Sequence, residues 1–128
     1  MNTVKININY LVPPALDWAV SKCEGVDDYI LSESFMTRWT DDEGVTYNYS
    51  TDWAQGGPII EREGMQLQME DISEWHATMW WDDGEGQREV VTRGPTPLIA
   101  AMRCYVASQL GDEVEIPGEI GASHELVD

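Results

Sequence analysis

The strongest constraint on the fold of this sequence is a pair of alternating segments joined by a short polar loop. Residues 74–81 and 88–92 are rich in aromatic and β-branched side chains, and the loop between them is Asp82-Asp-Gly-Glu-Gly86. A glycine-containing loop between two such runs predicts a β-hairpin. Its first strand carries bulky groups on both faces: Trp75, Ala77, Met79 and Trp81 on one, His76, Thr78 and Trp80 on the other. We therefore expect both faces to be at least partly covered.

Residues 97–110 give the clearest helix signal in the chain. Thr96 is a good N-cap, Pro97 suits the first helical position, and Gly111 is placed to end the helix. The apolar stripe of this helix consists of Leu98, Met102, Tyr105, Val106 and Leu110. A second helix is expected over residues 15–23, between two prolines and Gly25.

Three further segments are expected to be extended. Residues 1–10 alternate apolar and polar side chains, as a half-buried strand does. Residues 65–70 are expected to precede the hairpin as another strand, and residues 114–116 to form a short extended piece. This mixture of strands and helices predicts an α+β fold.

The 128 residues correspond to one domain. We expect a single α+β domain over residues 1–117, with an irregular insert at 26–48 in which 29–32 and 35–39 are candidate strand fragments. Residues 118–128 are expected to form an acidic, flexible tail.

Acidic residues dominate the charge, because 24 Asp and Glu face 7 Lys and Arg, for a formal net charge of −17. Nucleic acids and anionic membranes attract basic surfaces, so neither is expected as a partner. No apolar run approaches the roughly 20 residues of a membrane-spanning helix, and the amino terminus lacks a secretory apolar region. With Cys23 and Cys104 interpreted as buried free thiols, these features predict a cytoplasmic protein.

Catalytic chemistry finds little support in the sequence. The two histidines, His76 and His124, fall in a predicted strand and in the tail, without metal-ligand spacing around them. Neither cysteine lies near a histidine in the sequence, so a catalytic Cys–His pair has no local support. The acidic clusters at 41–43 and 82–83 resemble solvated turns. We expect no enzymatic activity, no metal and no cofactor.

One part of the chain contains residue types that suit a small-ligand site. Ser50, Thr51 and Asp52 are three successive candidate N-caps before Trp53. The following Gly56-Gly-Pro58 is expected to interrupt that helix, expose backbone amides and start a second short helix.

Two arginines complete this candidate site. Arg62 follows the glycines, and Arg93-Gly-Pro-Thr96 forms a second Gly-Pro helix start. Helix N-termini, cations and an aromatic ring together favour an anionic, ring-containing small ligand. The candidate ligand-binding residues are Ser50, Thr51, Asp52, Trp53, Gly56, Gly57, Arg62, Arg93 and Thr96. The alternative is structural: Trp53 lies in the core, the arginines pair with surplus acids, and the glycines only turn the chain.

Three segments resemble the NinX-like proteins of tailed bacteriophages and prophages. They are Leu16-Asp-Trp-Ala-Val-Ser-Lys-Cys-Glu-Gly25, residues 49–64 from Tyr-Ser-Thr-Asp-Trp to Glu-Arg-Glu-Gly, and residues 94–117 from Gly-Pro-Thr-Pro to Val-Glu-Ile-Pro. A more distant resemblance, carried by residues 49–52, 75–77 and 97–107, is to the phage ABA sandwich domain. These resemblances imply a small antiparallel β-sheet packed against or between helices, similar to an α-β-α sandwich. They also imply an accessory phage protein in the cytoplasm of the infected bacterium, and they supply no catalytic mechanism.

Two non-enzymatic functions remain open. The first is capture and sequestration of a small anionic, nucleotide-like ligand, such as a nucleotide signal of the host's antiphage defence. The alternative is an acidic protein-binding inhibitor, or DNA mimic, that occupies a basic host protein. The 6 tryptophans exceed what one small core needs, which predicts a homo-oligomer, most simply a dimer.

Overall fold

The computed structural model describes residues 3–13, 15–25, 29–31, 39–41 and 46–117. In chain order the elements are β1 (Thr3–Asn7), the 3-10 turn η1 (Ile8–Tyr10), α1 (Ala15–Cys23), β2 (Tyr29–Leu31), β3 (Trp39–Asp41), β4 (Thr46–Tyr47), α2 (Trp53–Glu63), β5 (Gln66–Asp71), β6 (Glu74–Asp82), β7 (Gln87–Gly94), α3 (Pro97–Leu110) and β8 (Glu113–Pro117). The strands form antiparallel sheets in the orders β1–β8, β2–β3–β4 and β5–β6–β7. The α+β prediction is confirmed.

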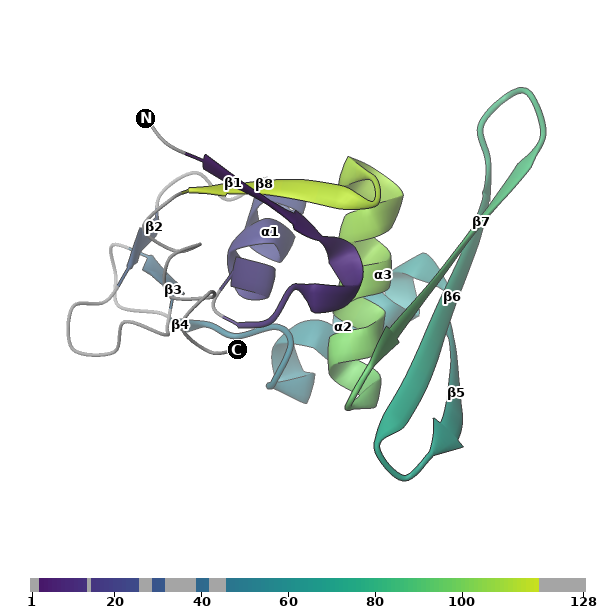
Figure 1. Ribbon diagram of the computed structural model, residues 1–128, viewed down its shortest axis with the longest axis horizontal. Coiled ribbons are helices and arrows are strands. Elements are labelled where there is room, and N and C mark those ends of the chain that lie inside the picture. The colour runs from purple at the N-terminus through teal and green to yellow at the C-terminus, as the bar shows by residue number, and fades with distance from the viewer. Residues whose placement is uncertain (1–2, 14, 26–28, 32–38, 42–45, 118–128) are drawn as a thin grey trace.

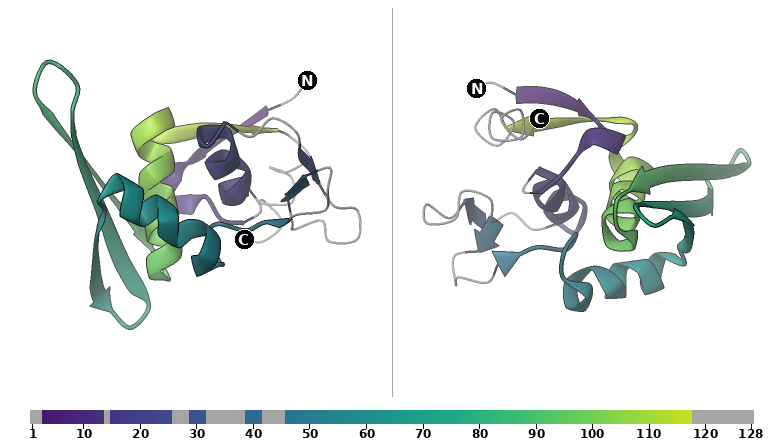
Figure 2. Two further views of the ribbon diagram at one scale, coloured as in Figure 1. Left: turned by 180° about the vertical axis from the view of Figure 1, so that it is seen from behind. Right: turned by 60° about the horizontal axis from the view of Figure 1, so that its bottom comes forward.

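Helix α3 is the centre of the molecule (Figure 1). The β5–β6–β7 sheet packs on one side of it, α1 and the β1–β8 pair lie on the other, and α2 crosses behind (Figures 1 and 2). Every residue from Ala100 to Ala107 is buried, including the charged Arg103. A helix that is buried all round is expected where one element fills the middle layer.

The hairpin prediction is confirmed by β6 and β7. Their register places Thr78 opposite Val91 and Trp80 opposite Glu89. Ala77 and Met79 are buried on the face that packs on α3, whereas on the other face Trp80 is 40% exposed and Val91 51%. His76 and Thr78 on that second face are half-buried, so both faces are at least partly covered, as the sequence led us to expect.

The two ends of the described chain pair with each other. The predicted strand over residues 1–10 is β1 followed by η1, because the Asn7 side chain accepts a hydrogen bond from the Asn9 amide and turns the chain. The predicted extended piece at 114–116 is β8, which lies antiparallel to β1. Val114 and Ile116 are buried on the inner side of this pair.

The predicted interruption at Gly56-Gly-Pro58 is wrong, because α2 runs through it without a break. Pro58 lacks an N–H and removes one helical hydrogen bond. Against this loss, the intact helix buries Ile59 and brings Gly56 against Leu98 of α3. Tertiary packing therefore outweighs the local helix-breaking preference.

The insert predicted to be irregular contains the three short strands β2, β3 and β4. The first candidate fragment, 29–32, coincides with β2, whereas the described strand near the second is β3 at Trp39–Asp41. Residues 35–38 and the predicted tail at 118–128 lie outside the described residues.

Candidate functional site

The N-termini of α2 and α3 lie side by side and enclose a small cavity. Asp52 caps α2 through its side chain, and Thr96 caps α3 by accepting a hydrogen bond from the Ile99 amide at 3.1 Å. Gly56 allows the two helices to approach closely, since a Cβ there would lie 2.7 Å from Leu98 Cδ1. The cavity has a volume of about 230 Å³ and is lined by Ser50, Thr51, Trp53, Thr96, Pro97, Leu98 and Ile99.

The structure thus brings four of the predicted ligand-binding residues together: Ser50, Thr51, Trp53 and Thr96. Trp53 is 53% exposed, so its ring is accessible for stacking on a flat ligand. Asp52 is the N-cap, as predicted, and its carboxylate accepts a hydrogen bond from the Ala54 amide at 2.9 Å.

Ser50 is held by a buried carboxylate on α1. Both its backbone N–H and its hydroxyl donate to Asp17 Oδ1, at 2.9 and 2.7 Å. Asp17 is only 3% exposed, and burial raises the pKa of its carboxyl to about 6, although the hydrogen bonds from Ser50 oppose the rise. Ser50 therefore anchors the turn before α2 to α1.

The two predicted glycines differ in their surroundings. Gly56 is buried, and a Cβ there would clash with the Tyr49 carbonyl oxygen as well as with Leu98. Beside Gly57 the nearest atom to an added Cβ is Trp53 Cε3, at 3.8 Å. Close packing of the chain therefore accounts for Gly56, and neither glycine is among the residues that line the cavity.

Arg62 does not line the cavity either. It binds the Glu24 carboxylate at 2.7 Å and that of Glu63 at 2.8 Å, and its guanidinium lies 5.5 Å from the centre of the Tyr105 ring. Hydrogen bonding from Arg62 lowers the pKa of Glu24, with a smaller contribution from the Tyr105 hydroxyl. This cluster joins the ends of α1 and α2 to α3.

Arg93 lies on a different side of α3. Its carbonyl accepts a hydrogen bond from Arg103 Nη1 at 2.7 Å, and its amide donates to Asn9 Oδ1 at 3.2 Å. Arg103 and Tyr105 are two residues apart on α3, about 200° around its axis. Because Arg62 contacts Tyr105 whereas Arg93 contacts Arg103, the structure does not bring the two predicted arginines together.

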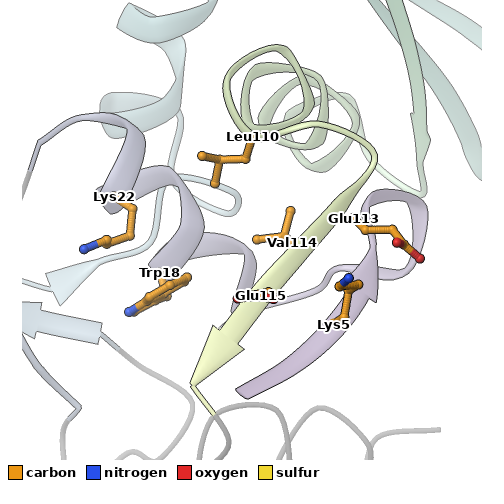
Figure 3. A pocket seen from close by; sticks show the side chains of 7 residues that line it. All are labelled: Lys5, Trp18, Lys22, Leu110, Glu113, Val114 and Glu115. Atoms are coloured by element: carbon orange, nitrogen blue, oxygen red, sulfur yellow. The ribbon is translucent and has the colours of Figure 1, made fainter. Parts of the chain in front are cut away.

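A larger cavity of about 510 Å³ lies elsewhere, between α1, the end of α3 and β8 (Figure 3). Trp18, Leu110 and Val114 form its apolar part, and Lys22 stands at the α1 side with its ammonium 5.9 Å from the Trp18 ring centre. No local sequence pattern indicates this cavity, because its walls come from segments about a hundred residues apart.

The described residues offer little catalytic machinery. The half-buried His76 side chain binds Glu74 at 2.8 Å, and burial raises the pKa of the Cys23 and Cys104 thiols to about 12 and about 11. Such thiols stay protonated at neutral pH and are poor nucleophiles. Within the described part of the chain, no group of three His, Cys, Asp or Glu side chains is placed to hold a metal ion.

Two buried charged residues were missed by the sequence analysis. Asp17 follows the apolar Leu16, and Arg103 stands between Met102 and Cys104, within helices that are otherwise apolar at these positions. Arg103 donates to the backbone carbonyls of Leu11 and Arg93. A charge inside an apolar helical stretch is the signal that would have indicated both.

Comparison with known proteins places the chain in a family. None of the described helices is long and apolar enough to cross a membrane. The chain matches no curated protein. Residues 7–109 match the model of the family described as Bacteriophage P22, NinX. This match spans most of the chain, and the protein therefore belongs to the bacteriophage NinX family.

Proposed function

We propose that this phage protein acts in the cytoplasm of the infected bacterium, without catalysis, by binding a basic host protein through its acidic surface. The observation that carries the proposal is the β6–β7 hairpin, which extends beyond the helices (Figures 1 and 2). Its loop exposes the residues Asp82, Asp83 and Glu85, and Glu89 is exposed on β7. A projecting acidic element suits a concave or flat basic surface.

The protein's own cations leave much of this charge unmatched. At the hairpin Arg88 pairs with Asp83, but no described cation forms an ion pair with Asp82 or Glu85. Arg62 is engaged by Glu24, and Arg103 is buried. Among the described residues, Asp17 is the buried carboxylate, so the negative charge of this part of the chain is carried largely at its surface.

Trp80 adds an aromatic contact beside these carboxylates. Its indole N–H donates to Glu89 Oε2 at 2.8 Å, which fixes the ring on the open face of the sheet. Val91 lies on the same face, on the neighbouring strand. An exposed tryptophan next to carboxylates offers a lysine or arginine both a cation–π contact and an ion pair.

Neutralising the hairpin is expected to abolish capture of the basic host protein. The variant Asp82→Asn/Glu85→Gln/Glu89→Gln removes three charges from the hairpin but keeps oxygen acceptors. Tagged protein in bacterial lysate, with crosslinking and mass spectrometry, measures the capture. Wild-type capture is expected to disappear as salt rises from about 0.05 M to about 0.5 M, because screening shortens the range of the attraction.

The matched control neutralises three carboxylates elsewhere, as Glu61→Gln/Glu70→Gln/Asp71→Asn. It has the same net charge as the hairpin variant, and we expect it to retain the partner. Equal capture by the two variants would show that the hairpin is not the binding element.

Capture of a small anionic, nucleotide-like ligand is the second candidate function, with a signal of the host's antiphage defence as the candidate molecule. It is favoured by one observation, the convergence of Trp53 with Ser50, Thr51 and Thr96 on one cavity. The cavity of about 230 Å³ has room for part of a nucleotide, with a base stacked on the exposed Trp53 ring. No described arginine or lysine lines it, and Asp52 stands next to it, so the acidic-surface proposal is the better supported.

Trp53→Ala is expected to weaken binding of nucleotides by about 5- to 150-fold if this second function holds, since stacking contributes about 1–3 kcal/mol per base. Native mass spectrometry and calorimetry with adenosine and guanosine nucleotides measure the loss. Trp80→Ala removes an exposed tryptophan outside the cavity and serves as the control. Unchanged nucleotide binding by Trp53→Ala would rule out the stacking site.

A further inference from the structure

Strand β8 has one open edge. In the described parts of the chain it pairs with β1 alone, with Val114 opposite Ile6. Beyond the end of β1 the same register continues, and the Ile8 N–H donates to the Asp112 carbonyl at 2.8 Å. Hydrogen-bonded pairs alternate with non-bonded pairs along an antiparallel ladder. Val114, two residues after Asp112, therefore also directs its N–H and C=O towards β1.

The residues between these positions direct their backbone groups the other way. Glu113 and Glu115 lie at non-bonded pairs, so their N–H and C=O groups point to the open edge. Pro117, which has no N–H, falls in the same outward class, which is where a strand tolerates proline. At this open edge Glu113 and Glu115 thus offer two N–H and two C=O groups in the spacing of a further strand.

The large cavity lies along this edge. Figure 3 shows Trp18, Leu110 and Val114 around the hollow, with β8 between the hollow and β1. The cavity has a volume of about 510 Å³, and a strand added to this edge would lie on the cavity side, about 4.8 Å from the β8 axis. Leu110 is 47% exposed at one end of the hollow, although it belongs to the apolar stripe of α3.

The charged residues around the open edge of β8 determine which side chains an added strand would need. Glu113 and Glu115 are exposed on the face of β8 opposite to Val114. Lys5 lies opposite Glu115 in the register of β1 and β8, and the Lys22 ammonium points away from β8 in Figure 3. A strand added at the open edge therefore meets glutamates on one face and apolar side chains on the other.

We propose that the open edge of β8 accepts an extended segment of another protein as an additional strand, with basic side chains beside Glu113 and Glu115 and apolar side chains towards Trp18 and Leu110. Backbone hydrogen bonds hold the segment, and the alternation of basic and apolar residues selects it. A second copy of this chain is a poorer occupant, because symmetric pairing of two β8 strands about Val114 places glutamate opposite glutamate. The site is independent of the β6–β7 hairpin.

The probe is an end-blocked peptide that alternates arginine and valine. It is expected to bind the full-length protein and to slow hydrogen exchange at the Glu113 and Glu115 amides, measured by NMR. The same peptide with N-methyl groups at alternate residues, which lacks the N–H groups of one edge, is expected to bind at least about tenfold more weakly, as is usual when hydrogen bonds are lost. A peptide that alternates glutamate and valine is expected not to bind.

Two protein variants separate backbone pairing from charge. Glu115→Pro removes an outward N–H and leaves the hydrogen bonds to β1 in place, so it is expected to lose the arginine–valine peptide. Glu113→Gln/Glu115→Gln keeps every backbone group, and it is expected to bind more weakly than wild type while still protecting both amides. The N-methyl peptide tests the same hydrogen bonds should Glu115→Pro disturb β8.

Four results would overturn the proposal. They are no binding of the arginine–valine peptide to wild type, equal binding of its N-methyl form, preference for the glutamate–valine peptide, and protection of Glu113 and Glu115 that depends on protein concentration without peptide. The last result would identify a second copy as the occupant. Each leaves the hairpin experiment unaffected, because the hairpin charges are intact in all of these measurements.

Discussion

Replacing Gly56 with alanine is expected to lower the free energy of unfolding by about 1–2 kcal/mol, because overpacking at this position costs about 2–3 kcal/mol and helix propensity offsets part of that cost. A Cβ at this position would clash with the carbonyl oxygen of Tyr49 and lie 2.7 Å from Leu98 Cδ1. The Tyr49 atom is a backbone oxygen, which cannot move away by a side-chain rotation. The higher helix propensity of alanine stabilises the folded protein by only about 1 kcal/mol, which does not fully offset the clash. Urea denaturation followed by tryptophan fluorescence measures the change.

Gly57→Ala provides the control in the same helix. The nearest atom to its new Cβ is Trp53 Cε3, at an ordinary contact distance of 3.8 Å. With no clash, the higher helix propensity of alanine is expected to raise the free energy of unfolding by about 0.5–1 kcal/mol. Opposite signs at adjacent glycines would demonstrate that packing against α3 selects Gly56. If both substitutions stabilise the protein, the close approach of α2 to α3 is not a constraint.

The elements predicted correctly from the sequence are those whose signals are local. The β6–β7 hairpin is specified by its own loop. There the carboxylates of Asp82 and Asp83 accept hydrogen bonds from the backbone amides of Gly84 and Glu85, respectively. Helix α3 is specified by Thr96 at its start and Gly111 at its end. In each case the residues that define the element are neighbours in the chain, so no knowledge of distant contacts is required.

The features that were missed or mispredicted depend on distant contacts. Strands β1 and β8 pair at the two ends of the described chain, and the sequence of neither strand predicts which strand it will pair with. Pro58 was expected to break α2, but the contact between Gly56 and Leu98, more than forty residues away, stabilises the continuous helix. Local helix propensity does not include the stabilisation that comes from contacts between distant residues.

The candidate ligand site was only half predictable for the same reason. Trp53 and Thr96 were expected to meet because each stands at a helix start, and the two helix starts do enclose one cavity. The position of Arg62 is set instead by Glu24 and Tyr105, which lie on α1 and α3. In a chain with so many carboxylates, an arginine has many candidate partners, and the sequence does not specify which it will bind.

Stability is expected to depend on pH through Asp17, with a sign opposite to that of most acidic residues. Burial raises the pKa of this carboxyl to about 6 in the folded protein, whereas an unfolded aspartate has a pKa of about 3.9. Between these values the folded protein holds a proton that the unfolded chain has released. The free energy of unfolding therefore falls as pH rises from about 4 to about 6, by about 2–3 kcal/mol from this one group.

Asp17→Asn isolates this contribution from the other carboxylates. Glu24, for example, has a lowered pKa and contributes the opposite slope in both proteins. At pH 4 wild type carries a neutral carboxyl at position 17, so the two proteins are expected to differ little. Above pH 7 the variant avoids a buried charge and is expected to be more stable by about 2 kcal/mol. Chemical denaturation at a series of pH values measures the difference.

The opposite outcome has an equally definite meaning. If Asp17→Asn becomes less stable than wild type as pH rises, the ionised carboxylate gains more from the Ser50 N–H and hydroxyl than it loses by burial. Asp17→Ala distinguishes acceptor from charge, because it leaves both Ser50 donors buried without Asp17 Oδ1 at every pH. Relative to Asp17→Asn it is expected to be less stable by about 2–6 kcal/mol at every pH, at about 1–3 kcal/mol for each of the two unsatisfied donors, because neither variant titrates at this position. A pH-independent stability difference between Asp17→Ala and Asp17→Asn, together with a pH-dependent gain of Asp17→Asn over wild type, would show that Ser50 requires an oxygen at this position but not a negative charge.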